Sequence, residues 1–191
     1  GAYKTVSPED VRSALAGLEG EEYYYRVLNE MTFGDPDLGI SFTVTVSTSG
    51  PGDWIYASHV TENAERVYLG SYSGVTYCVD PTGKVEKVYK TDDTIRRIEE
   101  RGAYIYIQTN YGLYVLKDDE MVNHIEIGVG DLETFANWGF VVKRDSRLSL
   151  HKQDGALLGT VRFSQEPREV IPTAEGMIVY TSKYRAVLVV S

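Results

Sequence analysis

Arg66-Val67-Tyr68-Leu69 is the first of four similar segments in this sequence. The others are Ala103-Tyr104-Ile105-Tyr106, Phe140-Val141-Val142-Lys143 and Met177-Ile178-Val179-Tyr180, and each starts 37 residues after the one before it. Gly102, Gly139 and Gly176 stand directly before the last three. An internal period of this length is typical of an architecture in which one supersecondary unit is stacked several times.

Within each period, short apolar runs are separated by turn residues in the same order. The first period has runs at 67–71, 75–80, 85–89 and 95–99, the second at 104–108, 113–117, 121–127 and 132–136, and the third at 141–143, 148–152, 157–163 and 169–172. Such short runs, rich in Val, Ile and Tyr and bounded by Gly, Asp and Pro, favour β-strands over the competing helical repeat. We therefore expect an all-β fold, a β-propeller of four-stranded antiparallel blades, since blades of the WD40 type repeat every 40–45 residues or so.

The run from Val67 to Val85 carries a resemblance to a known family. It reads Val-Tyr-Leu-Gly-Ser-Tyr-Ser-Gly-Val-Thr-Tyr-Cys-Val-Asp-Pro-Thr-Gly-Lys-Val. This order of a Val-Tyr-x-Gly-Ser strand, a glycine turn, an apolar strand ending in Asp and a Thr-Gly-Lys turn resembles the blade repeat of PQQ-like (quinoprotein-type) propellers. The resemblance fades in the later repeats, where the tryptophan that such repeats often carry on the third strand is missing, and Lys117-Asp118-Asp119-Glu120 and Lys152-Gln153-Asp154-Gly155 replace the Thr-Gly-Lys turn. It implies a propeller fold without a quinone cofactor, because the chain has too few blades and no residue matches the quinone ligands.

Three complete repeats do not close a ring, and an open propeller exposes sheet edges. Further strands are expected at 178–181 and 186–190 after the third repeat, and at 40–47 and 54–60 before the first. If the C-terminal pair and the N-terminal pair share one blade, residues 40–191 form four blades closed on themselves. The alternatives are a segment of a larger propeller or two half-rings that meet in a dimer.

Residues 1–39 are a different kind of segment. Ser7-Pro8-Glu9-Asp10 predicts a helix start, because a hydroxyl cap, a proline at the first helical position and acids near the positive dipole end follow one another. The apolar residues Val11, Ala14, Leu15 and Leu18 share one face of that helix, and Tyr24, Val27, Leu28 and Met31 fit a second helix, although Tyr23-Tyr24-Tyr25 also suits a strand. We expect a helical segment at 1–39, acting as a lid or as an arm to another domain or subunit, and a propeller domain at 40–191.

Composition limits the partners. The 191 residues carry a net charge of −9, which argues against a nucleic-acid partner because phosphate backbones require a concentrated basic surface. The sequence has neither an apolar stretch of eighteen residues nor a basic-then-apolar leader, so we expect no membrane span. A soluble protein, either cytoplasmic or secreted with its leader removed, fits these features.

No catalytic motif is present in the sequence. It lacks a phosphate-binding glycine loop, a Gly-x-Ser-x-Gly elbow and a calcium loop. His59, His124 and His151 fall on different predicted strands, and no Cys, His or acid spacing indicates a metal site. The single cysteine, Cys78, lies in an apolar run and is expected to be a buried structural thiol. We expect no cofactor and favour a binding protein over an enzyme.

The loops of a meander alternate between two faces, and this alternation sorts the candidate partner-binding residues. The first face is expected to hold Glu62, Glu65, Glu99, Glu100, Asp118, Asp119, Glu120, Asp154 and Glu175, with Trp138 as an exposed aromatic residue. The second face is expected to hold Tyr72, Tyr111, Arg144, Arg147, Lys183, Tyr184 and Arg185. Charge steers a partner's approach and buried aromatics carry binding energy, although charged loops also simply keep a domain soluble.

The hypothesis from the sequence is a non-catalytic β-propeller module that binds a protein or peptide, as part of a larger protein or assembly. A basic partner is one option, given the acidic loops, and the chain is expected as a monomer or as a dimer of half-rings. The alternatives are a small-molecule- or carbohydrate-binding propeller, a hydrolase that uses the central channel, or a structural spacer.

Overall fold

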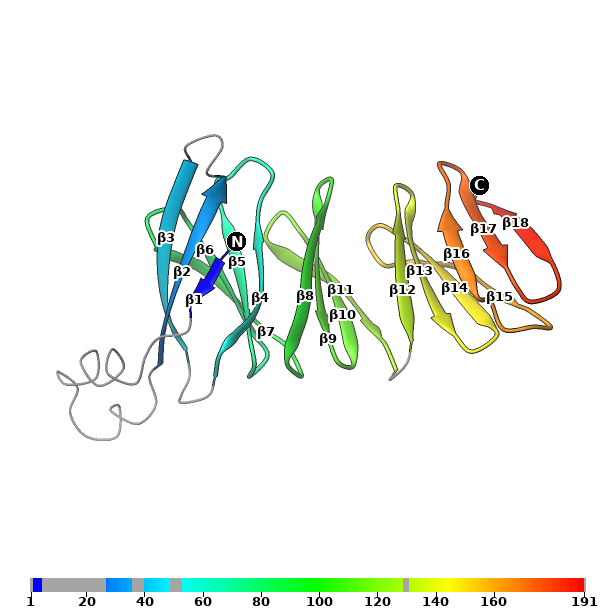
Figure 1. Cartoon of the computed structure of the whole chain (residues 1–191), viewed down its shortest axis with the longest axis horizontal. Coiled ribbons are helices and arrows are strands. Elements are labelled where there is room, and N and C mark those ends of the chain that lie inside the picture. Colours follow the sequence, from blue (N-terminus) through cyan, green and yellow to red (C-terminus); the bar gives the residue numbers. More distant parts are fainter. Residues whose placement is uncertain (1, 5–26, 36–39, 49–52, 129–130, 191) are drawn as a thin grey trace. The chain divides into compact units, whose positions relative to one another are not determined.

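The computed structural model describes residues 2–4, 27–35, 40–48, 53–128 and 131–190. These residues form strands and turns with no helix among them, and the strands make five antiparallel sheets, named A to E in chain order here (Figure 1). The chain divides into two compact units, residues 1–100 with 107–110 and residues 101–106 with 111–191.

Sheets A and B belong to the first unit. Sheet A contains β1 (Ala2–Lys4), β2 (Val27–Asp35) and β3 (Ile40–Thr48), in the order β1-β2-β3. Sheet B contains β4 (Ile55–Val60), β5 (Val67–Ser71), β6 (Val75–Val79) and β7 (Val85–Lys90), in chain order. Val46 of β3 is buried and packs with Ile55, Val67, Leu69 and Val79 of sheet B. β3 therefore packs against one face of sheet B at Val46.

Three further meanders follow along the chain. Sheet C contains β8 (Ile95–Arg101), β9 (Tyr104–Thr109), β10 (Gly112–Lys117) and β11 (Glu120–Glu126). Sheet D contains β12 (Leu132–Ala136), β13 (Gly139–Arg144), β14 (Arg147–Lys152) and β15 (Leu157–Arg162). Sheet E has three strands, β16 (Glu169–Pro172), β17 (Gly176–Tyr180) and β18 (Arg185–Val189).

Sheet D is buried on both faces, which explains the continuous apolar run in β13. Val142 joins a cluster with Phe140, Leu113 and Val115, whereas its neighbour Val141 joins a second cluster on the opposite face. That second cluster contains Leu148 and Leu150 of sheet D and Met177 and Val179 of sheet E. Successive side chains of a strand point to opposite faces, so a strand between two packed sheets must be apolar at consecutive positions.

The four-stranded antiparallel grouping is confirmed, but the expected blade limits are shifted by one strand. The runs expected to end the three repeats belong instead to β8, β12 and β16, and each of these strands is an edge strand that opens the next sheet. Each 37-residue period therefore begins at the second strand of a sheet. The pattern of apolar runs locates strands well, but it does not show where one meander stops and the next begins.

The pairing expected for a self-closed ring of four blades is not found in the part of the chain that the structure describes. β3 pairs with β2 over nine residues, from Val27↔Thr48 to Asp35↔Ile40, and β4 opens sheet B. β17 and β18 pair with each other and with β16. The C-terminal and N-terminal strands therefore share no described sheet.

The N-terminal expectations are tested only in part. The predicted helix at Ser7 to Leu18 lies outside the described residues. The second helix is wrong over Val27, Leu28 and Met31, because these residues belong to β2. The nine-residue pairing with β3 explains the difference, since a long hairpin can override a weak helical pattern. The domain boundary between residues 39 and 40 stays a prediction.

Candidate interaction surface

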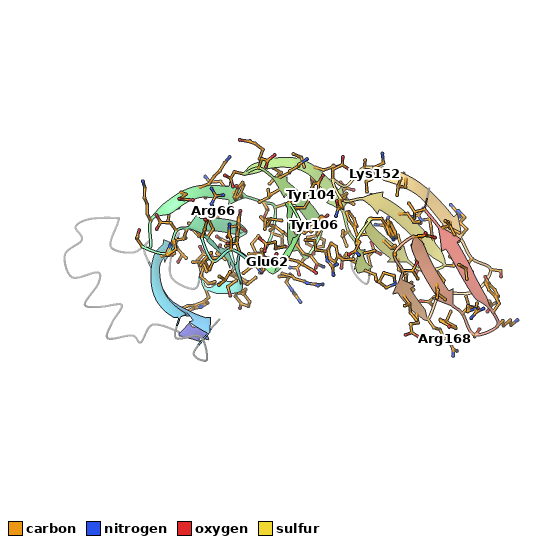
Figure 2. The ribbon with its side chains drawn as sticks, turned by 90° about the horizontal axis from the view of Figure 1, so that it is seen from above. Glu62, Arg66, Tyr104, Tyr106, Lys152 and Arg168 are labelled. Atoms are coloured by element: carbon orange, nitrogen blue, oxygen red, sulfur yellow. The ribbon has the colours of Figure 1, made fainter. Side chains whose placement is uncertain are left out.

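Of the four first-face glutamates in the first unit, two are exposed on a loop and two contact other side chains or backbone groups. Glu62 and Glu65 are exposed on the loop between β4 and β5 (Glu62 in Figure 2). Glu100 is half-buried. Its Oε1 accepts a hydrogen bond of 2.8 Å from the Glu62 N–H and lies 3.5 Å from His59 Nε2. Glu99 forms a close ion pair with Arg97. Glu99 and Glu100 thus lie within β8 rather than in a loop, and both have intramolecular partners.

Trp138 is not the exposed aromatic residue that the sequence suggested. It is half-buried in the turn between β12 and β13 and packs against the cluster that contains Met177 and Val179. Its indole N–H donates a 3.0 Å hydrogen bond to the Gly176 carbonyl. The sequence places Trp138 in a turn but does not give the direction of its side chain, which lies back against sheet E.

The remaining acids of the first face lie in turns within sheets, except Glu120, which is the first residue of β11. Asp118 and Asp119 are the two central residues of the β10–β11 turn, with φ values of 50° and 66°. Positive φ at both positions matches a type I′ turn, for which aspartate is well suited. Asp154 Oδ1 accepts a 2.9 Å hydrogen bond from the Ala156 N–H in the β14–β15 turn. Glu120 and Glu175 are exposed. Asp118, Asp119 and Asp154 thus lie in turns between strands of one sheet, as the sequence predicts. Glu175 was expected on a loop that joins two blades, but it lies between β16 and β17 of sheet E because the blade limits are shifted by one strand.

Arg144 of the second face is held by an internal carboxylate. Its Nε and Nη2 donate hydrogen bonds of 2.9 and 2.7 Å to Asp131 Oδ2, which also accepts the Gly128 N–H at 2.6 Å. Burial raises the pKa of Asp131, but the hydrogen bonds from Arg144 and Gly128 and the charges of Arg144 and Arg147 outweigh burial and lower it. The same contact with Asp131 raises the pKa of Arg144. Arg144 therefore holds the carboxylate of Asp131, the residue directly before β12.

The other second-face residues differ in exposure. Arg147 is half-buried, whereas Tyr111, Lys183, Tyr184 and Arg185 are exposed. The Tyr111 carbonyl accepts a 2.9 Å hydrogen bond from the Ile127 N–H, which fixes its backbone.

Two tyrosines meet on the surface of the first unit. Tyr72, in the turn between β5 and β6, is 54% exposed, and Tyr56 of β4 is 59% exposed. Their ring centroids lie 5.6 Å apart with planes tilted by 37°. Tyr56 lies where the register between β4 and β5 shifts, between Ile55 and Ala57. A bulge of this kind redirects a side chain, which brings Tyr56 beside Tyr72.

The backbone that carries Tyr72 is fixed on both sides. The Tyr72 N–H donates to the Trp54 carbonyl at 2.7 Å, and the Tyr72 carbonyl accepts the Thr94 hydroxyl at 2.7 Å. The next residue, Ser73, donates its N–H and its hydroxyl to the two carboxylate oxygens of Asp53, at 2.8 and 2.9 Å. Asp53 is buried, so the loop is anchored to the interior while the Tyr72 ring stays outside.

Polar groups border this tyrosine pair. Asn110 Nδ2 donates to Asp93 Oδ2 at 3.0 Å, and Arg96 Nη1 donates to Asn110 Oδ1 at 2.8 Å. The pKa of Asp93 is lowered, first by the Thr94 N–H and then by Asn110. We call Tyr56, Tyr72, Asp93, Thr94 and Asn110 the tyrosine surface. The sequence predicts Tyr72 as a surface candidate but not Tyr56 or the buried Asp53, because neither the bulge nor the buried carboxylate has a local sequence signal.

Two of the histidines, the cysteine and a tyrosine of β9 pack against or hydrogen-bond to neighbouring groups of the fold or are buried in it. His151 Nδ1 lies 2.9 Å from the Gly155 carbonyl and its ring stacks on Phe140, and His124 stacks on Tyr114. Cys78 is buried, which confirms that prediction. Tyr104 and Tyr106 lie on β9 (Figure 2), where Tyr106 is buried and its hydroxyl donates to the Gln153 carbonyl at 2.6 Å.

The described residues contain neither a metal-binding cluster nor a membrane-spanning helix. No group of three or more His, Cys, Asp or Glu side chains in them could hold a metal ion. Among the same residues, no helix has the length and apolar character needed to cross a membrane.

Comparison with known proteins supports the fold. No protein-family model and no curated protein sequence matches the chain. Among solved structures, it is similar to the WD40 β-propeller domain of Doa1 (TM-score 0.53, 8% identity, 82% of this chain and 58% of that one). It is also similar to the computationally designed proteins Ika8 (TM-score 0.54, 11% identity, 78% and 54%) and Ika4 (TM-score 0.52, 10% identity, 74% and 94%). The chain thus spans little more than half the length of the Doa1 domain and of Ika8. The fold is of the β-propeller type, whereas the finer resemblance to the PQQ-like repeat stays a prediction.

Proposed function

We propose that this chain is a non-catalytic module that binds a protein or peptide, and that the tyrosine surface is its binding site. One observation carries the proposal: Tyr72 presents a largely exposed ring on a backbone whose N–H and carbonyl are both hydrogen-bonded. Aromatic side chains held in this way lose little conformational entropy when a partner covers them, so they are efficient anchors at interfaces.

Burial adds to this argument. Removing a large apolar side chain from water lowers the free energy of the system. A tyrosine that is exposed in the free protein can therefore stabilise a complex when a partner covers it. Tyr56 and Tyr72 contact each other, so a partner segment would cover both rings together. The hydroxyls provide polar groups at the edge of the same contact.

The polar border indicates the kind of partner. Thr94, whose hydroxyl binds the Tyr72 carbonyl, directly follows Asp93, and the Asp93 carboxylate accepts the Asn110 amide. The exposed Asp92 adds a second carboxylate on the same loop. Such oxygens accept hydrogen bonds from the backbone N–H groups and basic side chains of a peptide. The acidic loop with Glu62 and Glu65 is the competing site.

The test is affinity capture of partners from a lysate of the source cells, followed by titration calorimetry with the captured protein. Tyr72→Ala should weaken binding by about 30-fold, equivalent to about 2 kcal/mol, because it removes the anchor. Replacing Glu62 and Glu65 together by lysine should leave the affinity within about threefold, since these exposed acids lie outside the tyrosine surface. Circular dichroism should show unchanged folding for both variants.

The opposite pattern would contradict the site. If the glutamate variant loses binding while Tyr72→Ala keeps it, the partner uses the acidic loop. If the captured molecule is converted to a product, the chain is an enzyme and the non-catalytic proposal is wrong.

A further inference from the structure

Sheet E has one face that packs on sheet D and one face that is open to solvent. Its strand pairings place Ile171, Ile178 and Val187 in one row across the sheet, because they lie opposite one another in β16, β17 and β18. A second row on this face contains Glu169, Tyr180 and Arg185. We call these six residues, with Val189, the outer face of sheet E. Val187 is 62% exposed and Val189 is 71% exposed.

The corresponding face of sheet D is covered by another sheet and provides a comparison. Val141 and Leu150 pair on β13 and β14, as Ile178 and Val187 pair on β17 and β18. Val141 stands 37 residues before Ile178, at the same place in the repeat. Leu150 is only 7% exposed because Met177 and Val179 of sheet E pack over it. The outer face of sheet E is thus built like a packing face, yet it has no described sheet on it.

We propose that the outer face of sheet E binds the same face of a second copy of this chain, forming a dimer with twofold symmetry. Two sheets that pack face to face keep their strands within about 30° of each other. A twofold axis parallel to the strands then places β16 over β18 of the partner subunit. Ile171 meets Val187 of the partner subunit, and the two copies of Ile178 meet at the axis.

Charge complementarity selects a second copy as the occupant. Glu169 and Arg185 lie at opposite ends of one row, separated by Tyr180. The same twofold axis brings Glu169 opposite Arg185 of the partner subunit, and it does so twice. Neither residue has an ion pair within the part of the chain that the structure describes, so both remain available for the partner. An interface of this kind is self-complementary in shape pattern and in charge.

The first experiment measures the oligomeric state by sedimentation velocity over a range of protein concentrations. The wild-type chain should dimerise, and Val187→Lys should raise the dissociation constant by about 100-fold or more, because it buries an unpaired charge in the apolar row. Leu157→Lys is the matched control: Leu157 is 61% exposed on β15, outside this face. It should dimerise as the wild type does. Both substitutions are at exposed positions, so circular dichroism should show unchanged folding.

A charge exchange tests the twofold pairing itself. Glu169→Arg and Arg185→Glu should each weaken the homodimer, because each places two pairs of like charges opposite one another. A mixture of the two variants should form a heterodimer, since every contact between 169 and 185 then joins opposite charges. A single chain that carries both substitutions should form homodimers again.

Three results would overturn the proposal. They are a wild-type chain that stays monomeric at all accessible concentrations, an equal loss of dimer in Val187→Lys and Leu157→Lys, and a mixture of the charge variants that shows no heterodimer. The first would mean that another sheet or another protein covers this face.

Discussion

The repeated glycines Gly102, Gly139 and Gly176, at or just before the start of the second strand of sheets C, D and E, are required for different physical reasons. A Cβ at Gly139 or Gly176 would overlap the carbonyl oxygen of the facing strand, at His151 and Leu188 respectively. Gly102 has free space around it but a φ of 57°, which favours glycine. The same residue at the same repeat position thus permits close strand approach in sheets D and E and a left-handed turn between β8 and β9.

Trp138 gives the first prediction at the residue scale. Trp138→Ala should lower the free energy of unfolding by about 2–4 kcal/mol, because it removes a large side chain from the contact between sheets D and E and the hydrogen bond to Gly176. Trp138→Phe keeps most of the packing and should cost about 1 kcal/mol. Urea unfolding measures both values. Glu175→Ala, at an exposed site, is the control and should change little; an equally silent Trp138→Ala would restore the idea of an exposed anchor.

Asp131 gives a prediction of pH dependence. Its pKa is lower in the folded chain than the ordinary value of about 3.9, so its contribution to stability is present above that pH and is lost as the pH falls through the folded pKa. Asp131→Asn should therefore flatten the loss of stability below about pH 4. At pH 7 the variant should be less stable by about 1 kcal/mol, since solvent screens part of the pair with Arg144. Thermal unfolding from pH 2 to pH 7 measures the difference. If the wild type and Asp131→Asn lose stability identically at low pH, the pair of Asp131 and Arg144 contributes little to stability.

At the scale of elements, turns were predictable where their determinants are local. Asp80-Pro81-Thr82-Gly83-Lys84 was expected to turn, and Asp80 Oδ1 accepts the N–H groups of Thr82 and Lys84 at 2.9 and 3.0 Å. Gly83 supplies a φ of 91°. All of these contacts lie within five residues, so the sequence contains the whole signal.

Features that depend on distant residues were not predictable in this way. The shift of the blade limits depends on which strand edges pair, and the Tyr56–Tyr72 contact depends on a bulge in β4. The buried Asp53 acts on Ser73, twenty residues away. The candidate site was therefore predicted only at Tyr72, whereas the strands themselves follow from local apolar runs.

The contact between β5 and β8 gives a prediction with a matched pair of glycines. A Cβ at Gly70 of β5 would overlap the buried side chain of Ile95 in β8, so Gly70→Ala should destabilise the chain by about 1–3 kcal/mol. Gly159 of β15 has open space around its Cβ position, and Gly159→Ala should be neutral or stabilise by about 0.5 kcal/mol. Denaturant melts compare the two variants. Equal effects would contradict the close packing of β5 on β8.

At the scale of the second unit, stability depends on the packing of sheet E over sheet D. Deleting residues 167–191 should expose Val141, Leu148 and Leu150 of sheet D, which are now buried under Met177 and Val179. The shortened chain should bind a hydrophobic dye and melt at a lower temperature. Deleting residues 185–191 alone should have a smaller effect, because Met177 and Val179 remain. A full deletion that melts as the wild type does would show that sheet E contributes no cover.

The shift between the sequence period and the sheet limits has a consequence for how such a chain grows by duplication. Each 37-residue copy supplies the second, third and fourth strands of one sheet and the first strand of the next, so two neighbouring copies contribute strands to one sheet. Loss of one whole copy joins the first strand of one sheet directly to the second strand of the following sheet. The remaining sheets then keep their full number of strands. A deletion that removes only some of the strands of one copy leaves at least one sheet short of a strand. Length variants in natural relatives should therefore differ by whole periods, whichever residue the duplication starts from.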